Sequence, residues 1–155
     1  QYHLMIPWFK KKQLLTVDEN RLVMEAIKSF EKKTSGEIRV FMESRNPLVN
    51  TIERAQVVFG ELQMHQTKDR NGVLLYLAVK DREVALLGDE GIHQKVGTAF
   101  WEKQVAEMIQ LFKQNNLTEG MVKCIEKVGQ VLVEKFPHDG TTDQNELSDE
   151  IVFGK

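Results

Sequence analysis

The fold is decided by the stretch DRNGVLLYLAVKDREVALLGDEG, which runs from Asp69 to Gly91 and is the most apolar run in the chain. Residues 73–79 form an unbroken apolar segment of strand length, which is typical of an inner strand covered on both faces. The charged break at residues 80–82 is too short for a crossover helix, so residues 83–87 must return antiparallel beside the first strand. The sequence therefore predicts a buried hairpin at the centre of the fold.

A helix, a strand and a second helix are predicted before this hairpin. Thr16 and Glu19 have the spacing of a capping box, which predicts a helix start there. Residues 37–43 alternate between apolar and polar side chains, as a half-buried strand does. A second helix, starting near Asn50, joins this strand to the inner strand. Such a connection is usually a right-handed crossover, so we expect the two strands to be parallel.

Two more helices are predicted after the hairpin, from about residue 98 to 114 and from about residue 118 to 136, where Pro137 ends the pattern. The predicted order is helix, strand, helix, strand, strand, helix, helix. Helices on both faces of a small mixed sheet give an α/β fold of the three-layer α/β/α sandwich type.

The chain divides into three parts on this interpretation. Residues 1–15 are an N-terminal arm, residues 16–137 are one domain, and residues 138–155 are an acidic C-terminal tail. We expect the tail to be partly disordered and to dock, if it docks, through residues 151–153.

Composition narrows the class of protein. A chain of 155 residues with 41% apolar side chains can bury one core but not two. The net charge of -2 argues against nucleic acid as a partner, and the single cysteine, Cys124, excludes an internal disulfide and a cysteine-based metal cluster. No run approaches the roughly 20 apolar residues that span a bilayer. We therefore expect a cytoplasmic monomer without a transmembrane segment, unless a leader has been removed.

Familiar catalytic motifs are missing from the sequence. It has no Gly-rich phosphate loop ending in Lys-Ser or Lys-Thr, no GxGxxG, no HExxH and no GxSxG. The four histidines are scattered without the spacing of zinc ligands. Carboxylates are the remaining candidates for chemistry.

Several carboxylates are predicted to gather at one edge of the sheet. Asp69 precedes the inner strand, whereas Asp89 and Glu90 follow its antiparallel partner, so the two turns should meet. Glu37 begins the first strand and should reach the same edge. Ca²⁺ or Mg²⁺ would take oxygen ligands from these acids and from loop carbonyls, which are those of Asn71, Gly72, Gly88 and Gly91.

Plainer roles remain open for the same residues. Aspartate and glutamate beside glycine are usually solvated turn residues. Glu37 is equally well explained as an exposed ion-pair partner of Arg39 or Lys33.

The sequence resembles the TPM-domain family, of the short soluble bacterial type. The likeness is carried by TSGEIRV at residues 34–40, RNGVLLYLAVKDR at residues 70–82, LGDEGI at residues 87–92, and Glu119-Gly120 near the start of the last helix. It covers roughly residues 16–136. The resemblance implies a mixed sheet flanked by helices, in agreement with the pattern above.

The resemblance also implies a choice of function. The family name comes from a thylakoid-lumen protein with acid phosphatase activity, a photosystem II associated protein and a membrane modulator of acetylcholine receptors. One expectation is a metal-linked, phosphatase-like hydrolase with weak phosphomonoesterase activity. The alternative is a non-catalytic module that binds other protein complexes. Longer members usually carry a glutamate where this chain has His93, although Asp89 and Glu90 could replace that charge.

Overall fold

The computed structural model describes residues 14–48, 50–138 and 150–154. The elements, in chain order, are α1 (Val17–Glu31), β1 (Glu37–Glu43), α2 (Thr51–Glu61), the 3-10 helix η2 (Met64–Gln66), β2 (Gly72–Ala78), β3 (Glu83–Gly88), α3 (Glu90–Val96), α4 (Thr98–Lys113), α5 (Leu117–Lys135) and β4 (Val152–Phe153).

The strands form one mixed sheet in the order β3-β2-β1-β4. β2 and β3 are antiparallel, with Val73 opposite Gly88. β1 runs parallel to β2, with Glu37 opposite Gly72, and β4 runs parallel to β1 on its other side. The hairpin and the parallel crossover predicted from the sequence are therefore confirmed.

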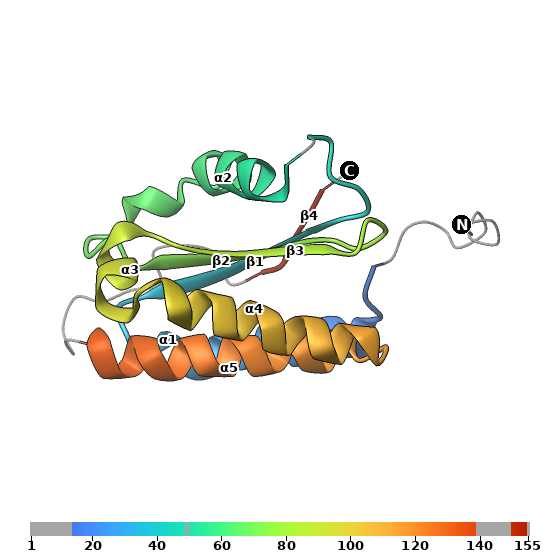
Figure 1. Cartoon of the computed structure of the whole chain (residues 1–155). Coiled ribbons are helices and arrows are strands. Elements are labelled where there is room, and N and C mark those ends of the chain that lie inside the picture. Colours follow the sequence, from blue (N-terminus) through green and yellow to red (C-terminus); the bar gives the residue numbers. More distant parts are fainter. Residues whose placement is uncertain (1–13, 49, 139–149, 155) are drawn as a thin grey trace.

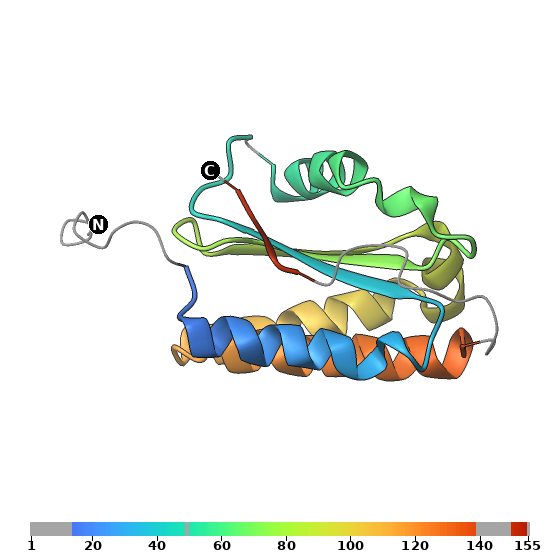
Figure 2. The same ribbon diagram turned by 180° about the vertical axis from the view of Figure 1, so that it is seen from behind.

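Helices cover both faces of this sheet, as Figures 1 and 2 show from opposite sides. α2 lies on one face, and α1, α4 and α5 lie on the other. All seven residues of β2 are buried, because this strand has neighbours on both sides and a layer of helix on each face. The three-layer sandwich is confirmed, and no helix in the described ranges is long and apolar enough to cross a membrane.

The two predicted helix caps are also present. The Thr16 hydroxyl accepts a hydrogen bond from the Glu19 amide at 3.1 Å, and the Glu19 carboxylate accepts one from the Thr16 amide at 2.9 Å. The Asn50 side chain accepts from the Glu53 amide at 3.0 Å at the start of α2. These contacts satisfy amides that have no partner within the first helical turn.

The sequence predicts a turn or a short helix from Gly91 to residues 96–97, and the structure has a short helix there, α3, with Asp89 as its N-cap. One element goes beyond the predicted order. Part of the expected tail forms β4, and Ile151 beside it is only 7% exposed. The described part of the tail, residues 150–154, thus docks through the residues named in the prediction.

The helical layer contains the single cysteine of the chain. Cys124 lies on α5, is 3% exposed, and belongs to the apolar cluster between the sheet and α1, α4 and α5. Burial is the main factor that raises the pKa of its thiol, with a smaller contribution from Glu107, to about 12. The cysteine is a packing residue rather than a nucleophile, because only a thiolate attacks.

On the opposite face, a buried charged group ties α2 to the sheet. The Glu43 carboxylate accepts hydrogen bonds from Arg54 Nε at 2.8 Å and Arg54 Nη2 at 3.0 Å. The hydroxyl of Tyr76, which is fully buried on β2, donates to the same carboxylate. Burial first, and then the Glu43 carboxylate, raise the pKa of this tyrosine, which therefore stays protonated and can donate.

Substitution of Arg54 by Met should destabilise the fold by roughly 3 kcal/mol, because it leaves the Glu43 charge buried without its partner. Urea unfolding followed by circular dichroism measures this change. Substitution of Arg21 by Met is the matched control: its ion pairs with Asp18 and Glu25 are exposed, so the loss of stability should be much smaller. Equal losses in the two variants would contradict a structural role for the buried pair.

Candidate functional site

The turns before β2 and after β3 meet at one edge of the sheet, at the left of Figure 1. The Arg70 carbonyl accepts hydrogen bonds from the Gly91 amide at 2.8 Å and from the Ile92 amide at 3.3 Å. The Asp89 amide donates to the Gly72 carbonyl at 2.9 Å. The convergence predicted from the antiparallel pairing is therefore present.

The approach of the two turns depends on a residue without a side chain. A β-carbon on Gly91 would lie 2.0 Å from the Asp69 carbonyl oxygen and 2.6 Å from that of Arg70. Backbone atoms cannot yield at such distances, so glycine is required for this contact.

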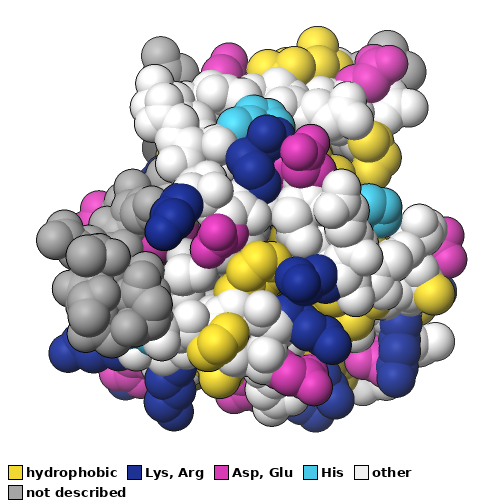
Figure 3. Space-filling view, turned by 90° about the vertical axis from the view of Figure 1, so that its left-hand side faces the viewer, with side chains coloured by type: hydrophobic (Ala, Val, Ile, Leu, Met, Phe, Trp, Pro, Cys, Tyr) yellow, Lys and Arg dark blue, Asp and Glu magenta, His cyan; other side chains and the backbone are white. Residues whose placement is uncertain are grey.

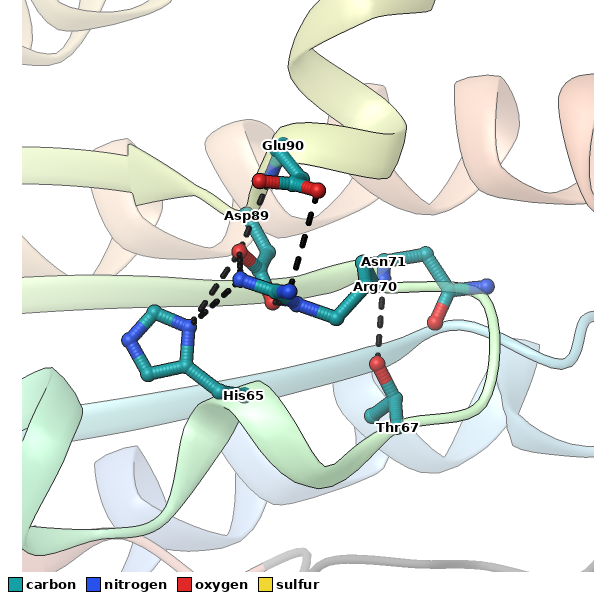
Figure 4. A network of polar contacts seen from close by, with 6 residues as sticks. All are labelled: His65, Thr67, Arg70, Asn71, Asp89 and Glu90. Atoms are coloured by element: carbon teal, nitrogen blue, oxygen red, sulfur yellow. Dashed lines mark hydrogen bonds and ion pairs between the residues drawn. The ribbon is translucent and has the colours of Figure 1, made fainter.

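Arg70 provides the dominant charge contact at this edge, shown in Figure 4. Its Nε donates to Asp89 Oδ2 at 2.7 Å and its Nη2 donates to Asp89 Oδ1 at 2.9 Å, which is a bidentate pair. Its Nη1 lies 3.7 Å from the exposed Glu90 carboxylate. The backbone of Arg70 has a φ of 50°, a left-handed conformation that costs roughly 1–2 kcal/mol in a non-glycine residue.

His65, from η2, joins the same group. Its Nδ1 lies 3.3 Å from Asp89 Oδ1 and 3.1 Å from Arg70 Nη2. Its ring contacts Phe59 of α2 edge to face, with centroids 4.7 Å apart. The histidine therefore connects the charged edge to the apolar layer under α2.

Asp89 has a structural role at the centre of this group. Its side chain is 3% exposed and also accepts a hydrogen bond from the Glu90 amide at 2.8 Å, at the start of α3. Burial acts to raise the pKa of Asp89, but the hydrogen bonds from Arg70 and Glu90, together with the charges of Arg70 and His65, outweigh burial and lower it. The carboxylate is thus held in its ionised form.

A second group of polar side chains lies where the chain enters β2. Ser35, which precedes β1, contacts Asp69 and Asn71 there. The Ser35 hydroxyl donates to the exposed Asp69 carboxylate at 3.3 Å and accepts from Asn71 Nδ2 at 3.2 Å. Asn71 is fully buried, and its backbone amide donates to Thr67 Oγ1 at 3.0 Å. The side-chain oxygen of Asn71 is buried without any hydrogen-bond partner.

The other residues of the predicted set have mixed positions. Glu37 is buried at the start of β1, and its amide donates to the Asn71 carbonyl at 3.4 Å, so it does reach this edge. Glycine residues 72, 88 and 91 were predicted to lie in loops, and this is wrong. Gly72 and Gly88 are the end residues of strands, where ladder pairing continues, and Gly91 lies in the first turn of α3.

The structure therefore divides the predicted metal ligands into two groups. Asp89 and Glu90 face the guanidinium of Arg70, which already supplies the positive charge, so these two acids do not fit a cation. In the part of the chain that the structure describes, no three His, Cys, Asp or Glu side chains are placed to hold a metal ion. Asp69 faces the Ser35 hydroxyl rather than a guanidinium, and the side-chain oxygen of Asn71, two residues further on, has no hydrogen-bond partner.

Sequence reasoning missed Arg70 and His65 as members of this edge. Figure 3 faces the edge and shows basic, acidic and histidine side chains intermixed rather than a field of one charge. The helical spacing of Ile92 and Val96 after Asp89 is a signal that could have marked Asp89 as an N-cap. No pattern in the sequence indicates that Arg70 turns back onto Asp89.

Comparison with known families identifies the chain. A family model described as the TPM domain matches residues 9–131. The chain belongs to the TPM-domain family. None of the functionally curated proteins compared with it matched.

Solved structures of similar proteins agree with this assignment. The NMR structure of the BA42 protein from the psychrophilic bacterium Bizionia argentinensis is 39% identical, with a TM-score of 0.85, and the match covers 94% of this chain and 99% of BA42. The N-terminal domain of a Corynebacterium glutamicum protein is 15% identical, with a TM-score of 0.61, over 77% of this chain and 74% of that one. A P. gingivalis N-terminal domain is 16% identical, with a TM-score of 0.69, over 83% of each chain. These last two share the fold of this TPM domain.

Replacement of Asp89 by Asn should lower the free energy of unfolding by about 1–2 kcal/mol at neutral pH, because the amide can still cap α3 but carries no charge for Arg70. The folded pKa of Asp89 lies below its unfolded value of 3.8, so its stabilising charge is present above pH 3.8 and is lost as the pH falls through the folded pKa. The difference between the two proteins should therefore shrink below pH 3.8.

Urea unfolding at a series of pH values measures this difference. Replacement of Glu90 by Gln is the control, because this exposed acid lies near the same guanidinium but at 3.7 Å, and it should change stability by less than about 0.5 kcal/mol. A pH-independent difference for the Asp89 variant would contradict the charge assignment.

Proposed function

We propose that this TPM domain binds Ca²⁺ or Mg²⁺ through Asp69 and Asn71 at the start of β2, and that it is a phosphatase-like hydrolase with weak activity on phosphomonoesters. The observation that carries the proposal is the Asn71 side-chain oxygen, which is buried without a hydrogen-bond partner. Leaving such an atom unsatisfied costs roughly 1–3 kcal/mol, and a cation would remove that cost.

The neighbouring groups support this choice of ligand. Asp69 is exposed, so its carboxylate can share an ion with water or with a phosphate oxygen from solution. The Ser35 hydroxyl contacts the Asp69 carboxylate at 3.3 Å and Asn71 Nδ2 at 3.2 Å, so it links the two side chains. Two protein side chains leave most of the six to eight Ca²⁺ coordination positions to other oxygen atoms, so we expect weak binding, with a Kd of roughly 0.1–1 mM.

The chemistry follows from the class of ion. A bound divalent cation polarises a phosphoryl oxygen or lowers the pKa of a water molecule. The part of this chain is to orient: the Ser35 hydroxyl fixes the Asp69 carboxylate, and the Thr67 hydroxyl fixes the Asn71 backbone. Arg70 is held by Asp89 beside this group and is 39% exposed, so an incoming phosphate could reach its outer face.

The second candidate is the non-catalytic interaction module. It is favoured by the pairing of Asp89 with Arg70, which gives one of the four predicted acids a structural role. In that case the same edge binds a protein rather than turning over a substrate.

Titration with Ca²⁺ or Mg²⁺ should shift the backbone NMR signals of Ser35, Asp69 and Asn71, and a chelator should reverse the shifts. Substitution of Asp69 by Asn, or of Asn71 by Leu, should weaken binding by roughly tenfold or more, since each removes one ligand oxygen. Substitution of Glu102 by Gln, an exposed acid on α4, is the control and should leave the titration unchanged. Identical titrations for the wild type and for both ligand variants would refute the site.

Activity is tested separately with p-nitrophenyl phosphate between acidic and neutral pH. The proposal expects slow turnover that a chelator abolishes and that the Asp69 variant reduces by roughly tenfold or more. Cation binding without any turnover would reject the hydrolase and leave the non-catalytic module in its place.

A further inference from the structure

The side of β1 that faces away from β2 pairs with an extended strand, and in this chain that strand is β4. We call this side of β1 the strand-binding site. Phe41 pairs with Val152 and Met42 pairs with Phe153 in parallel register. The Gly154 amide donates to the Met42 carbonyl at 2.7 Å. Figure 2 shows β4 lying across β1 on the side away from β2.

Successive side chains of this segment enter different layers of the fold. Ile151 is 7% exposed and belongs to the apolar cluster beneath α1, α4 and α5. Val152 packs against the opposite cluster, under α2. Phe153 is 45% exposed. Two of the three apolar side chains, those of Ile151 and Val152, therefore pack against the strand-binding site, whereas that of Phe153 is exposed.

The position after Phe153 is selective for glycine. A β-carbon on Gly154 would lie 2.9 Å from Glu43 Cβ, 2.9 Å from Glu43 Oε1 and 2.9 Å from Phe41 Cζ. Glu43 cannot move aside, because Arg54 and Tyr76 hold its carboxylate from behind. The buried network of Glu43, Arg54 and Tyr76, which ties α2 to the sheet, thus also limits the space at position 154 of the strand-binding site.

We propose that the β1 edge is a peptide-binding site for a partner protein that carries an extended aliphatic-aliphatic-x-Gly segment, which adds to the sheet as a parallel strand. Residues 151–154 are the tethered occupant and show the chemistry that the site accepts. Strand addition of this kind draws affinity from the backbone and specificity from alternate side chains. The proposal goes beyond the cation site, which lies at the entrance of β2 and involves none of these contacts.

A partner segment must bind β1 more strongly than the tethered β4 does. A segment joined by a short linker behaves as though it were present at roughly millimolar concentration. Among residues 150–154, which the structure describes, Val152 and Phe153 pair with β1, and burial of Ile151 contributes roughly 1.5–3 kcal/mol. A partner segment with more paired residues can therefore displace β4.

The test uses the full-length chain with Gly154→Val, which should release β4, and a synthetic peptide with the sequence of residues 148–155. The NMR signals of Phe41, Met42 and Glu43 should move on release of β4 and return towards their wild-type positions as the peptide binds. The wild-type chain should need about tenfold more peptide, because its own strand competes. Ile151→Asp gives a second released chain should the first variant fold poorly.

Two matched peptides test which side chains the strand-binding site accepts. A peptide carrying Gly154→Val should not bind, whereas one carrying Phe153→Ser should bind within about threefold of the natural sequence, since Phe153 is exposed. Binding of the valine peptide, or no β1 shifts with the natural peptide on either released chain, would overturn the proposal. A wild-type dimer that both substitutions dissociate would replace the partner protein with a second copy of this chain.

Discussion

The complete burial of β2 is the constraint on which the rest of the structure depends. No residue of this strand reaches solvent, so a polar group on it must find a partner inside the protein. Tyr76 is the polar side chain on β2, and its hydroxyl meets Glu43 on the next strand. The Glu43 charge then requires Arg54, which comes from α2. One buried hydroxyl thus connects two layers of the sandwich and shapes the edge where β4 lies.

Because β2 itself is buried, the polar side chains that could bind a ligand lie at its ends. At the entrance of β2, Arg70 adopts a left-handed backbone conformation, directs its guanidinium to Asp89 and its carbonyl to the α3 amides. The bidentate contact between Arg70 and Asp89 is made from that conformation. As a result Asp69 lies on the other side of the entrance, next to Ser35 and Asn71, rather than beside Asp89. Backbone geometry at one residue therefore decides which acids can share a ligand.

Sequence reasoning was most successful where a single local pattern has one physical meaning. The apolar run 73–79 and the capping box at Thr16 each predicted the observed element. It was weaker where the same residues suit two roles. Asp89 before Glu90 suits either a metal loop or a helix cap, and the choice depends on Arg70, whose φ no sequence pattern encodes. The register of β4 was also beyond prediction, because two paired residues show no alternation.

The buried thiol of Cys124 has a practical consequence for spectroscopic work. With the thiol 3% exposed and its pKa raised to about 12, the fraction present as thiolate at neutral pH is very small, so the folded protein should react slowly with maleimide or disulfide reagents. A new cysteine engineered at an exposed position can therefore carry a fluorophore or spin label selectively. The difference in reaction rate lets a brief labelling step leave Cys124 in place, so distances across the sandwich can be measured with a single substitution per site.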